Sequence, residues 1–257
     1  RPPISTLFPY TTLFRSGADS NNGHLVLLVE NERGYENLIY MVSKAHTEGF
    51  YNKPRVDIEL LKTHSEGLIA LSACLGGFVQ QRLLNGDFEG AREHALLLNS
   101  IFGQDSFFLE LQNHGIEGQA EVAGRLSLLS RQTGIPLVAT NDIHYLRKQD
   151  AEAQAVLMCI QTNSDINDGR PFGFETDEFY LKTEQQMREL FPANPEAIDN
   201  TVRIADRCEF HFDFSKLYLP VFQLPQGQTP DAYLRGLALE GLGKILSHSS
   251  PPAPEAD

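Results

Sequence analysis

The sequence predicts an α/β protein in which parallel strands are covered by helices. From Gly23 onward, short apolar runs alternate with amphipathic stretches of helical period. Each apolar run lacks the polar alternation of a half-exposed strand, which is typical of strands buried on both faces. The runs are also separated by helical segments, as in repeated βα units. A β/α barrel and a doubly wound sheet are the two architectures that fit this pattern.

The elements predicted in the first half follow one another as strand and helix. Glycines mark the expected turns, and Gly134 is a suitable end for the last helix. The predicted strands are 24–29, 67–72, 106–111 and 136–140, and the predicted helices are 34–48, 79–84, 91–102 and about 117–133.

The second half has a different character. We predict turn formers over 163–173, a short strand at 179–181, and helices over 151–161, 184–190 and 195–207. Residues 210–228 are expected to form an extended connector, and Thr229 with Pro230 opens a helix over 229–246. The final stretch, 247–257, is rich in serine and proline and is expected to be a disordered tail.

The first sixteen residues are expected to be foreign to the fold. Residues 6–16 read TLFPYTTLFRS, with two Thr-Leu-Phe repeats and no amphipathic period, and resemble a translated sequencing adaptor. A genuine apolar N-terminal strand is the alternative. We therefore expect an artefact over 1–16 and an incomplete domain that begins near residue 17.

Composition narrows the classes of function. The 257 residues are 41% hydrophobic and 21% charged, as in soluble globular proteins, and no apolar run suggests a membrane partner or a secretory signal. We expect a cytoplasmic protein. Three cysteines without CxxC spacing argue against a disulfide framework. The net charge of −13 opposes phosphate binding over the whole surface, so any nucleic-acid contact must be local.

Candidate metal ligands follow three of the predicted strands: Cys74, His114, and the pair Asp142 and His144. The carboxyl ends of parallel strands meet at one edge, where chemistry collects. On an extended strand Asp142 and His144 would share a face about 7 Å apart. Each residue alone has an ordinary interpretation: a small core thiol, a turn histidine, a carboxylate that caps the next turn and a loop imidazole. Their coincidence at successive strand ends favours a metal site.

A few other residues have two interpretations. Glu110 shares a strand face with Gln112. It either lies behind the ligands and holds them by hydrogen bonds, or it pairs with a lysine. Lys53 and Arg55 form a small basic loop that could touch a DNA backbone, although two such charges are more often simply solvated. We expect Cys159 and Cys208 to be buried and His46, His64 and His94 to face solvent.

Several long motifs resemble the polymerase and histidinol phosphatase (PHP) domain of bacterial DNA polymerase III alpha subunits. The resemblance covers roughly residues 23–242, and the order of the motifs makes it specific. The motifs lie at residues 34–38 (GYENL), 49–57 (GFYNKPRVD), 66–77 (EGLIALSACLGG), 109–115 (LELQNHG), 134–145 (GIPLVATNDIHY) and 174–182 (FETDEFYLK).

This resemblance implies an incomplete, distorted (β/α)7 PHP barrel over residues 17–209, then a short helical connector toward the polymerase region. It also implies zinc or manganese held by Cys74, His114, Asp142 and His144. The family's remaining ligands, including an opening His-x-His, would lie upstream of His24, so we expect this chain alone to be inactive.

For the parent protein the resemblance implies DNA-directed DNA polymerase activity on DNA and dNTPs. Its palm carboxylates, with magnesium, lie outside this chain. A metal-dependent 3′-5′ exonuclease activity of the PHP site is the second implied function. The alternative is a non-catalytic structural module that docks replisome subunits such as a proofreading exonuclease. A stand-alone PHP phosphatase is a weaker third interpretation, because the connector and the helix after Thr229 indicate a continuing protein.

Overall fold

The computed structural model describes residues 23–51, 53–165, 174–217, 219 and 222–248. The predicted artefact at 1–16, most of the predicted turn region 163–173 and residues 249–257 of the predicted tail lie outside the described residues. The chain divides into a unit of residues 1–211 and a unit of residues 212–257.

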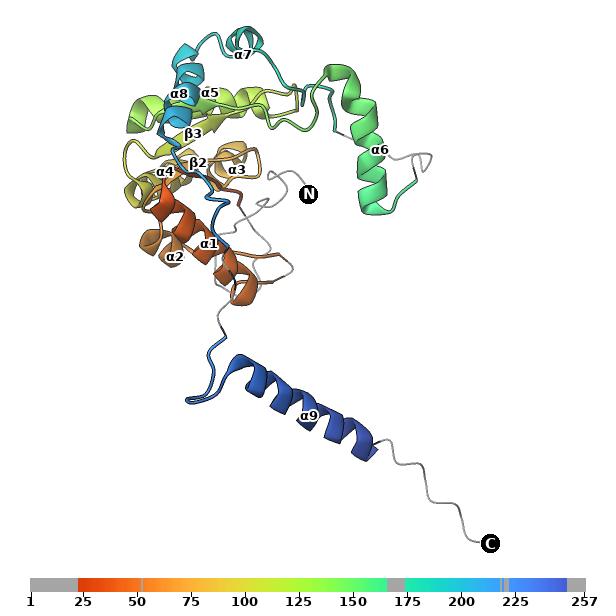
Figure 1. The fold of residues 1–257 in the computed structure, drawn as a ribbon. Coiled ribbons are helices and arrows are strands. Elements are labelled where there is room, and N and C mark those ends of the chain that lie inside the picture. Colours follow the sequence, from red (N-terminus) through yellow and green to blue (C-terminus); the bar gives the residue numbers. More distant parts are fainter. Residues whose placement is uncertain (1–22, 52, 166–173, 218, 220–221, 249–257) are drawn as a thin grey trace. The chain divides into compact units, whose positions relative to one another are not determined.

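Four strands form one sheet in the order β1-β2-β3-β4 (Figure 1). Strands β2, β3 and β4 are parallel, as the sequence predicts, with Ala70 opposite Phe107 and Leu109 opposite Leu137. The α/β class is confirmed, whereas a seven-stranded barrel is not confirmed by the sheet that the described residues form. The strands are β1 (Val26–Val29), β2 (Leu68–Leu71), β3 (Phe107–Leu111) and β4 (Leu137–Ala139).

The prediction that every strand runs parallel is wrong for β1. This strand is antiparallel to β2, with Val26 opposite Leu71. The backbone N–H of Glu30, just after β1, donates to the carbonyl of Gly67, just before β2, at 2.9 Å. The helices between β1 and β2 therefore lead the chain back to the edge of the sheet at which β1 ended. An all-apolar strand shows burial but carries no information on direction, so the sequence pattern could not distinguish the two arrangements.

Two glycines make this return possible. A Cβ atom on Gly34, in the first turn of the first helix, would lie 1.8 Å from the carbonyl oxygen of Gly67. Gly67 itself has φ +73°, in the left-handed region that glycine adopts without strain. The helix that follows β1 therefore starts directly against the beginning of β2.

The predicted helices of the first half are confirmed with small shifts at their ends. Local capping fixes several of them: Asn31, Asp57 and Asp87 each accept a hydrogen bond from a backbone N–H three residues later. Gly134 ends its helix at φ +73°. The predicted helices are α1 (Glu32–Thr47), α3 (Phe78–Leu84), α4 (Phe88–Phe102) and α5 (Gln119–Thr133), and the short helix α2 (Ile58–Thr63) was not predicted.

The helices of the second half also lie where the sequence predicts them. The last helix runs to His248, so the first two residues of the predicted tail are helical. The predicted strand at 179–181 is reduced to one bridge between Tyr145 and Tyr180. These helices are α6 (Ala151–Thr162), preceded by the 3-10 turn η2 (Lys148–Asp150), then α7 (Glu184–Leu190), α8 (Pro195–Arg207) and α9 (Pro230–His248).

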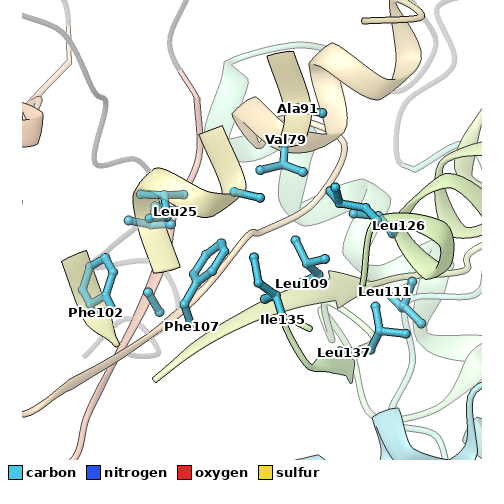
Figure 2. Close-up of a cluster of buried hydrophobic side chains, with 14 of the residues drawn as sticks. Leu25, Val79, Ala91, Phe102, Phe107, Leu109, Leu111, Leu126, Ile135 and Leu137 are labelled. Carbon is cyan, nitrogen blue, oxygen red and sulfur yellow. The ribbon is translucent and has the colours of Figure 1, made fainter. Parts of the chain in front are cut away.

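Helices cover both faces of the sheet. On one face, side chains from β2, β3 and β4 pack against α1 to α5, with Phe107, Leu109 and Leu126 almost fully buried (Figure 2). On the other face, Phe108 and Val138 pack against Ile204 of α8. Burial on both faces explains why these strands have no polar alternation. None of the helices in the described ranges has the combination of length and hydrophobicity that a bilayer span requires.

Two histidines are less exposed than predicted. His64 is half-buried and stacks on Tyr40, with ring centroids 4.4 Å apart. His94, on α4, is half-buried with its ring tilted over Phe78, 5.2 Å between centroids. Burial lowers the pKa of His94 to about 4, and the charge of Arg82 adds to this effect. The prediction that His94 faces solvent is wrong because a helical position shows its environment only once the neighbouring helix has packed.

The low pKa of His94 predicts acid sensitivity. The pKa of His94 is about 4 in the folded protein, against an ordinary value of 6.5, so the unfolded chain binds the proton more readily between these values. Stability is therefore lost as the pH falls below 6.5. The unfolding free energy of the original protein should fall between pH 7 and pH 5. We expect this fall to be about 1 to 2 kcal/mol smaller in His94→Leu. Urea denaturation at both pH values measures this difference.

The exposed His46 on α1 provides the matched control. His46→Leu should leave the difference between the two pH values as it is in the original protein. An equal gain from both substitutions would show that His94 is not the source of the acid sensitivity.

Candidate metal centre

The candidate ligands lie where strands β2, β3 and β4 end. Because these three strands are parallel, their carboxyl ends share one edge of the sheet, which we call the rim. Cys74 follows β2 and is half-buried, while His114 follows β3 and is buried. Asp142 and His144 follow β4 and are exposed. The fold therefore brings the four predicted residues to one edge.

A buried carboxylate supports the rim from below. Glu110, in β3, is 4% exposed. Its Oε2 accepts a hydrogen bond from the backbone N–H of Ala73 at 3.0 Å, and its Oε1 accepts one from Thr140 at 2.5 Å. Gln112 donates to the same Oε1 at 3.1 Å. Glu110 thus binds groups at the ends of all three parallel strands. Of the two interpretations left open by the sequence, this environment matches the supporting role.

Burial raises the pKa of Glu110, and its hydrogen bonds oppose that effect. A second side chain extends the same network: the hydroxyl of Ser72 accepts from the backbone N–H of Glu110 at 2.8 Å and from Gln80 at 2.7 Å. Gln80 also donates to the carbonyl of Ala73 at 2.9 Å. Ala73 has φ +67°, an unfavourable conformation for alanine, and these bonds on both sides hold it there.

His24 also lies at the rim, although the sequence did not indicate it as a ligand. Its Nδ1 is 3.4 Å from the Sγ atom of Cys74. His24 lies just before β1, whereas the predicted ligands all follow the ends of strands. Because β1 is antiparallel to β2, its beginning lies beside the end of β2. His24 could have been predicted as a rim residue only if the direction of β1 had been known.

The ring of His24 fits closely against the turn after Cys74. A Cβ atom on Gly76 would lie 2.8 Å from His24 Nδ1, so the ring needs glycine at that position. Burial lowers the pKa of His24, and burial raises the pKa of the Cys74 thiol. Both shifts favour the uncharged forms, so the pair rests as a neutral imidazole and a thiol.

His114 is held by hydrogen bonds through both ring nitrogens. Oε1 of Gln119 accepts from the backbone N–H of His114 at 2.7 Å, which fixes the orientation of the Gln119 amide. Nε2 of Gln119 then donates to Nδ1 of His114 at 3.0 Å. The other nitrogen, Nε2 of His114, must carry the proton and donate to the carbonyl of Asn141 at 2.9 Å. In this arrangement the imidazole has no free lone pair for a metal.

An aromatic ring covers the same imidazole. Phe179 stacks on His114 with ring centroids 4.1 Å apart and an interplanar angle of 6°. Burial lowers the pKa of His114, which keeps the ring neutral. These contacts are those of a packed core histidine, and ligation by His114 would require its hydrogen bonds to Asn141 and Gln119 to break.

Asp142 and His144 are not on an extended strand, and that part of the prediction is wrong. Asp142 has φ +40°, which turns the chain sharply just beyond β4. The turn brings Nδ1 of His144 to 2.7 Å from the carbonyl of Asp142 and to 3.9 Å from its Oδ1. A hydrogen bond from Nδ1 to that carbonyl leaves the lone pair on Nε2 of His144. The two side chains therefore stay close, but by a turn rather than by strand periodicity.

The donor types suit a divalent metal, but their arrangement does not close a site. Burial is the main influence on the pKa of His24, Cys74, Glu110 and His114, and the charge of Asp142 is a further influence on each. In the described part of the chain, however, no three His, Cys, Asp or Glu residues are grouped closely enough to hold an ion. The described residues do not form a complete metal site.

Comparison with known proteins identifies related sequences. Residues 9–114 match the PHP domain, a range that includes His24, Cys74 and His114. DNA polymerase III subunit alpha of Treponema pallidum is 46% identical over 85% of the chain, and that of Thermus aquaticus is 43% identical over 88%. Each alignment covers 19% of the relative, so the chain spans about a fifth of the length of these proteins.

The environment of Glu110 predicts a large difference between two substitutions. Glu110→Ala removes the acceptor of three donors, and leaving buried donors unpaired costs about 2 to 4 kcal/mol of unfolding free energy. Glu110→Gln keeps an oxygen for the N–H of Ala73 and should cost less than half as much. Denaturant unfolding of both variants measures these costs. Equal stability of the two variants would contradict a role for the hydrogen-bond network.

Proposed function

Since this chain carries a PHP domain and is related to DNA polymerase III subunit alpha, we propose that it is a segment of a replicative DNA polymerase. The observation that carries the proposal is the 46% identity over 220 residues to the Treponema pallidum protein, a relationship that extends well beyond the matched PHP range. The proposed activity of the complete protein is template-directed DNA synthesis from dNTPs. No residue of this chain is assigned to the polymerisation step itself.

The second part of the proposal concerns the rim. Cys74, Asp142 and His144, with the newly found His24, supply the thiolate, carboxylate and imidazole donors that zinc or manganese accepts. A bound divalent ion would supply a polarised phosphodiester and an activated water. Within this chain, Glu110 holds the Cys74 turn, and the turn at Asp142 keeps its carboxylate near His144.

A structural role for the domain is the second candidate, and one observation favours it. Both ring nitrogens of His114 take part in hydrogen bonds, and the described residues lack a group of three metal donors. A rim of this kind suits a scaffold that binds other replisome proteins, such as a proofreading exonuclease, without chemistry of its own. A stand-alone phosphatase is disfavoured by the similarity to much longer polymerase subunits.

Primer extension tests the first part of the proposal. The complete protein that contains this chain should extend a primed DNA template when dNTPs and Mg²⁺ are supplied. Omission of the template is the control, because template-directed synthesis requires it. Failure to extend a primer, together with hydrolysis of small phosphate esters, would contradict the polymerase assignment.

The incomplete grouping of donors predicts that the 257-residue chain alone is inactive. We expect no turnover of bis(p-nitrophenyl) phosphate above the metal-only background when Mn²⁺ or Zn²⁺ is added, because phosphoester chemistry needs ions fixed in position. Turnover measured by p-nitrophenolate absorbance would decide this. Activity that disappears in Asp142→Asn but persists in the surface variant Asp213→Asn would show that the rim is already complete.

A further inference from the structure

The loop between α1 and α2 exposes two aromatic side chains next to two basic ones. Phe50 and Tyr51 are 58% and 57% exposed, which is unusual for adjacent aromatic residues in a chain with a substantial core. Lys53 and Arg55 follow in the same loop. We call Phe50, Tyr51, Lys53 and Arg55 the aromatic-basic loop.

Backbone and side-chain contacts give this loop a defined shape. The N–H of Tyr51 donates to the carbonyl of Lys53 at 3.0 Å. Nη2 of Arg55 donates to the carbonyl of Tyr51 at 2.9 Å, and the guanidinium lies 4.7 Å from the centroid of the Tyr51 ring. This cation–π contact orients the phenol ring and the guanidinium together.

Arg55 retains unused hydrogen-bonding capacity. Its Nε–H is shielded from solvent and has no acceptor among the described residues. A shielded donor without an acceptor is costly, and a small movement of the guanidinium would present it to an anionic group. Arginine is the side chain best suited to a phosphate because its planar donors match two oxygens.

The two basic side chains of the loop contrast with the charge of the whole protein. The net charge is −13, so most of the surface would repel a nucleic acid and any contact with it must be local. The loop places Lys53 and Arg55 next to two exposed aromatic rings.

We propose that the aromatic-basic loop binds single-stranded nucleic acid. Phe50 and Tyr51 would stack on bases, and Lys53 and Arg55 would contact the adjacent phosphates. Stacking surfaces combined with basic groups are the usual recognition mode for single strands, since every base has a π-face. This proposal rests on the proposed function of the chain as a segment of a DNA polymerase. It assigns to that segment a contact surface for single strands.

Anisotropy of a fluorescein-labelled twelve-nucleotide oligo-dT, titrated with the 257-residue chain at low salt, tests the proposal. We expect Tyr51→Ala to weaken binding about tenfold, since loss of a stacking residue removes the contact with one base. Tyr51→Phe keeps the ring and should retain most of the affinity. Lys53→Gln should also weaken binding and reduce the salt slope by about 0.7, as expected for one lost phosphate contact on a single strand.

Matched controls lie elsewhere in the chain. Phe214 is 88% exposed and Lys216 is an exposed lysine, so Phe214→Ala and Lys216→Gln change the same kinds of side chain outside the loop. Both should bind the oligonucleotide like the original protein. Equal losses in the control and loop variants, or unchanged binding by Tyr51→Ala, would overturn the proposal. Absence of binding by the original protein would overturn it too.

These outcomes separate the loop from the polymerase assignment. If the complete protein extends primers while oligo-dT binding is independent of Tyr51, only the loop proposal fails. If binding depends on Tyr51 but primer extension is absent, the loop binds single strands and the polymerase assignment fails. Preferential displacement of the oligo-dT by an unlabelled duplex rather than a single strand would also count against the loop proposal.

Discussion

The arrangement of the rim depends on one buried carboxylate. Glu110 lies inside the sheet and accepts hydrogen bonds from groups at the ends of β2, β3 and β4. A carboxylate in this position is costly to bury, and its donors compensate for that cost. The same contacts hold the unfavourable conformation of Ala73, and so they set the position of Cys74. The geometry of the candidate centre is thus decided one layer below the candidate ligands.

The direction of β1 is the second determinant. An antiparallel β1 places its beginning at the edge where the other strands end, and so brings His24 against Cys74. One reversed strand therefore accounts for a rim residue that the analysis of strand ends did not identify.

The rim combines features of a reactive site and of a packed core. Asp142 and His144 are exposed and close to each other, whereas His114 is stacked under Phe179 with both ring nitrogens hydrogen-bonded. His114 can bind a metal only if it gives up one of these hydrogen bonds. The catalytic and the scaffold interpretations therefore differ in the state of a few side chains rather than in the fold.

The sequence by itself determined the α/β class, the positions of most helices and strands, and the gathering of Cys74, His114, Asp142 and His144 at one edge. The class and the element positions follow from local patterns, namely apolar periodicity and turn residues such as Gly134. The gathering at one edge follows from the parallel pairing predicted from the helical connections, which the sheet confirms for β2, β3 and β4. Only the tertiary structure decided the direction of β1, the partners of His114 and the burial of His94. Each of these depends on contacts between residues far apart in the chain, and an apolar run or a single histidine carries no local record of its distant partner.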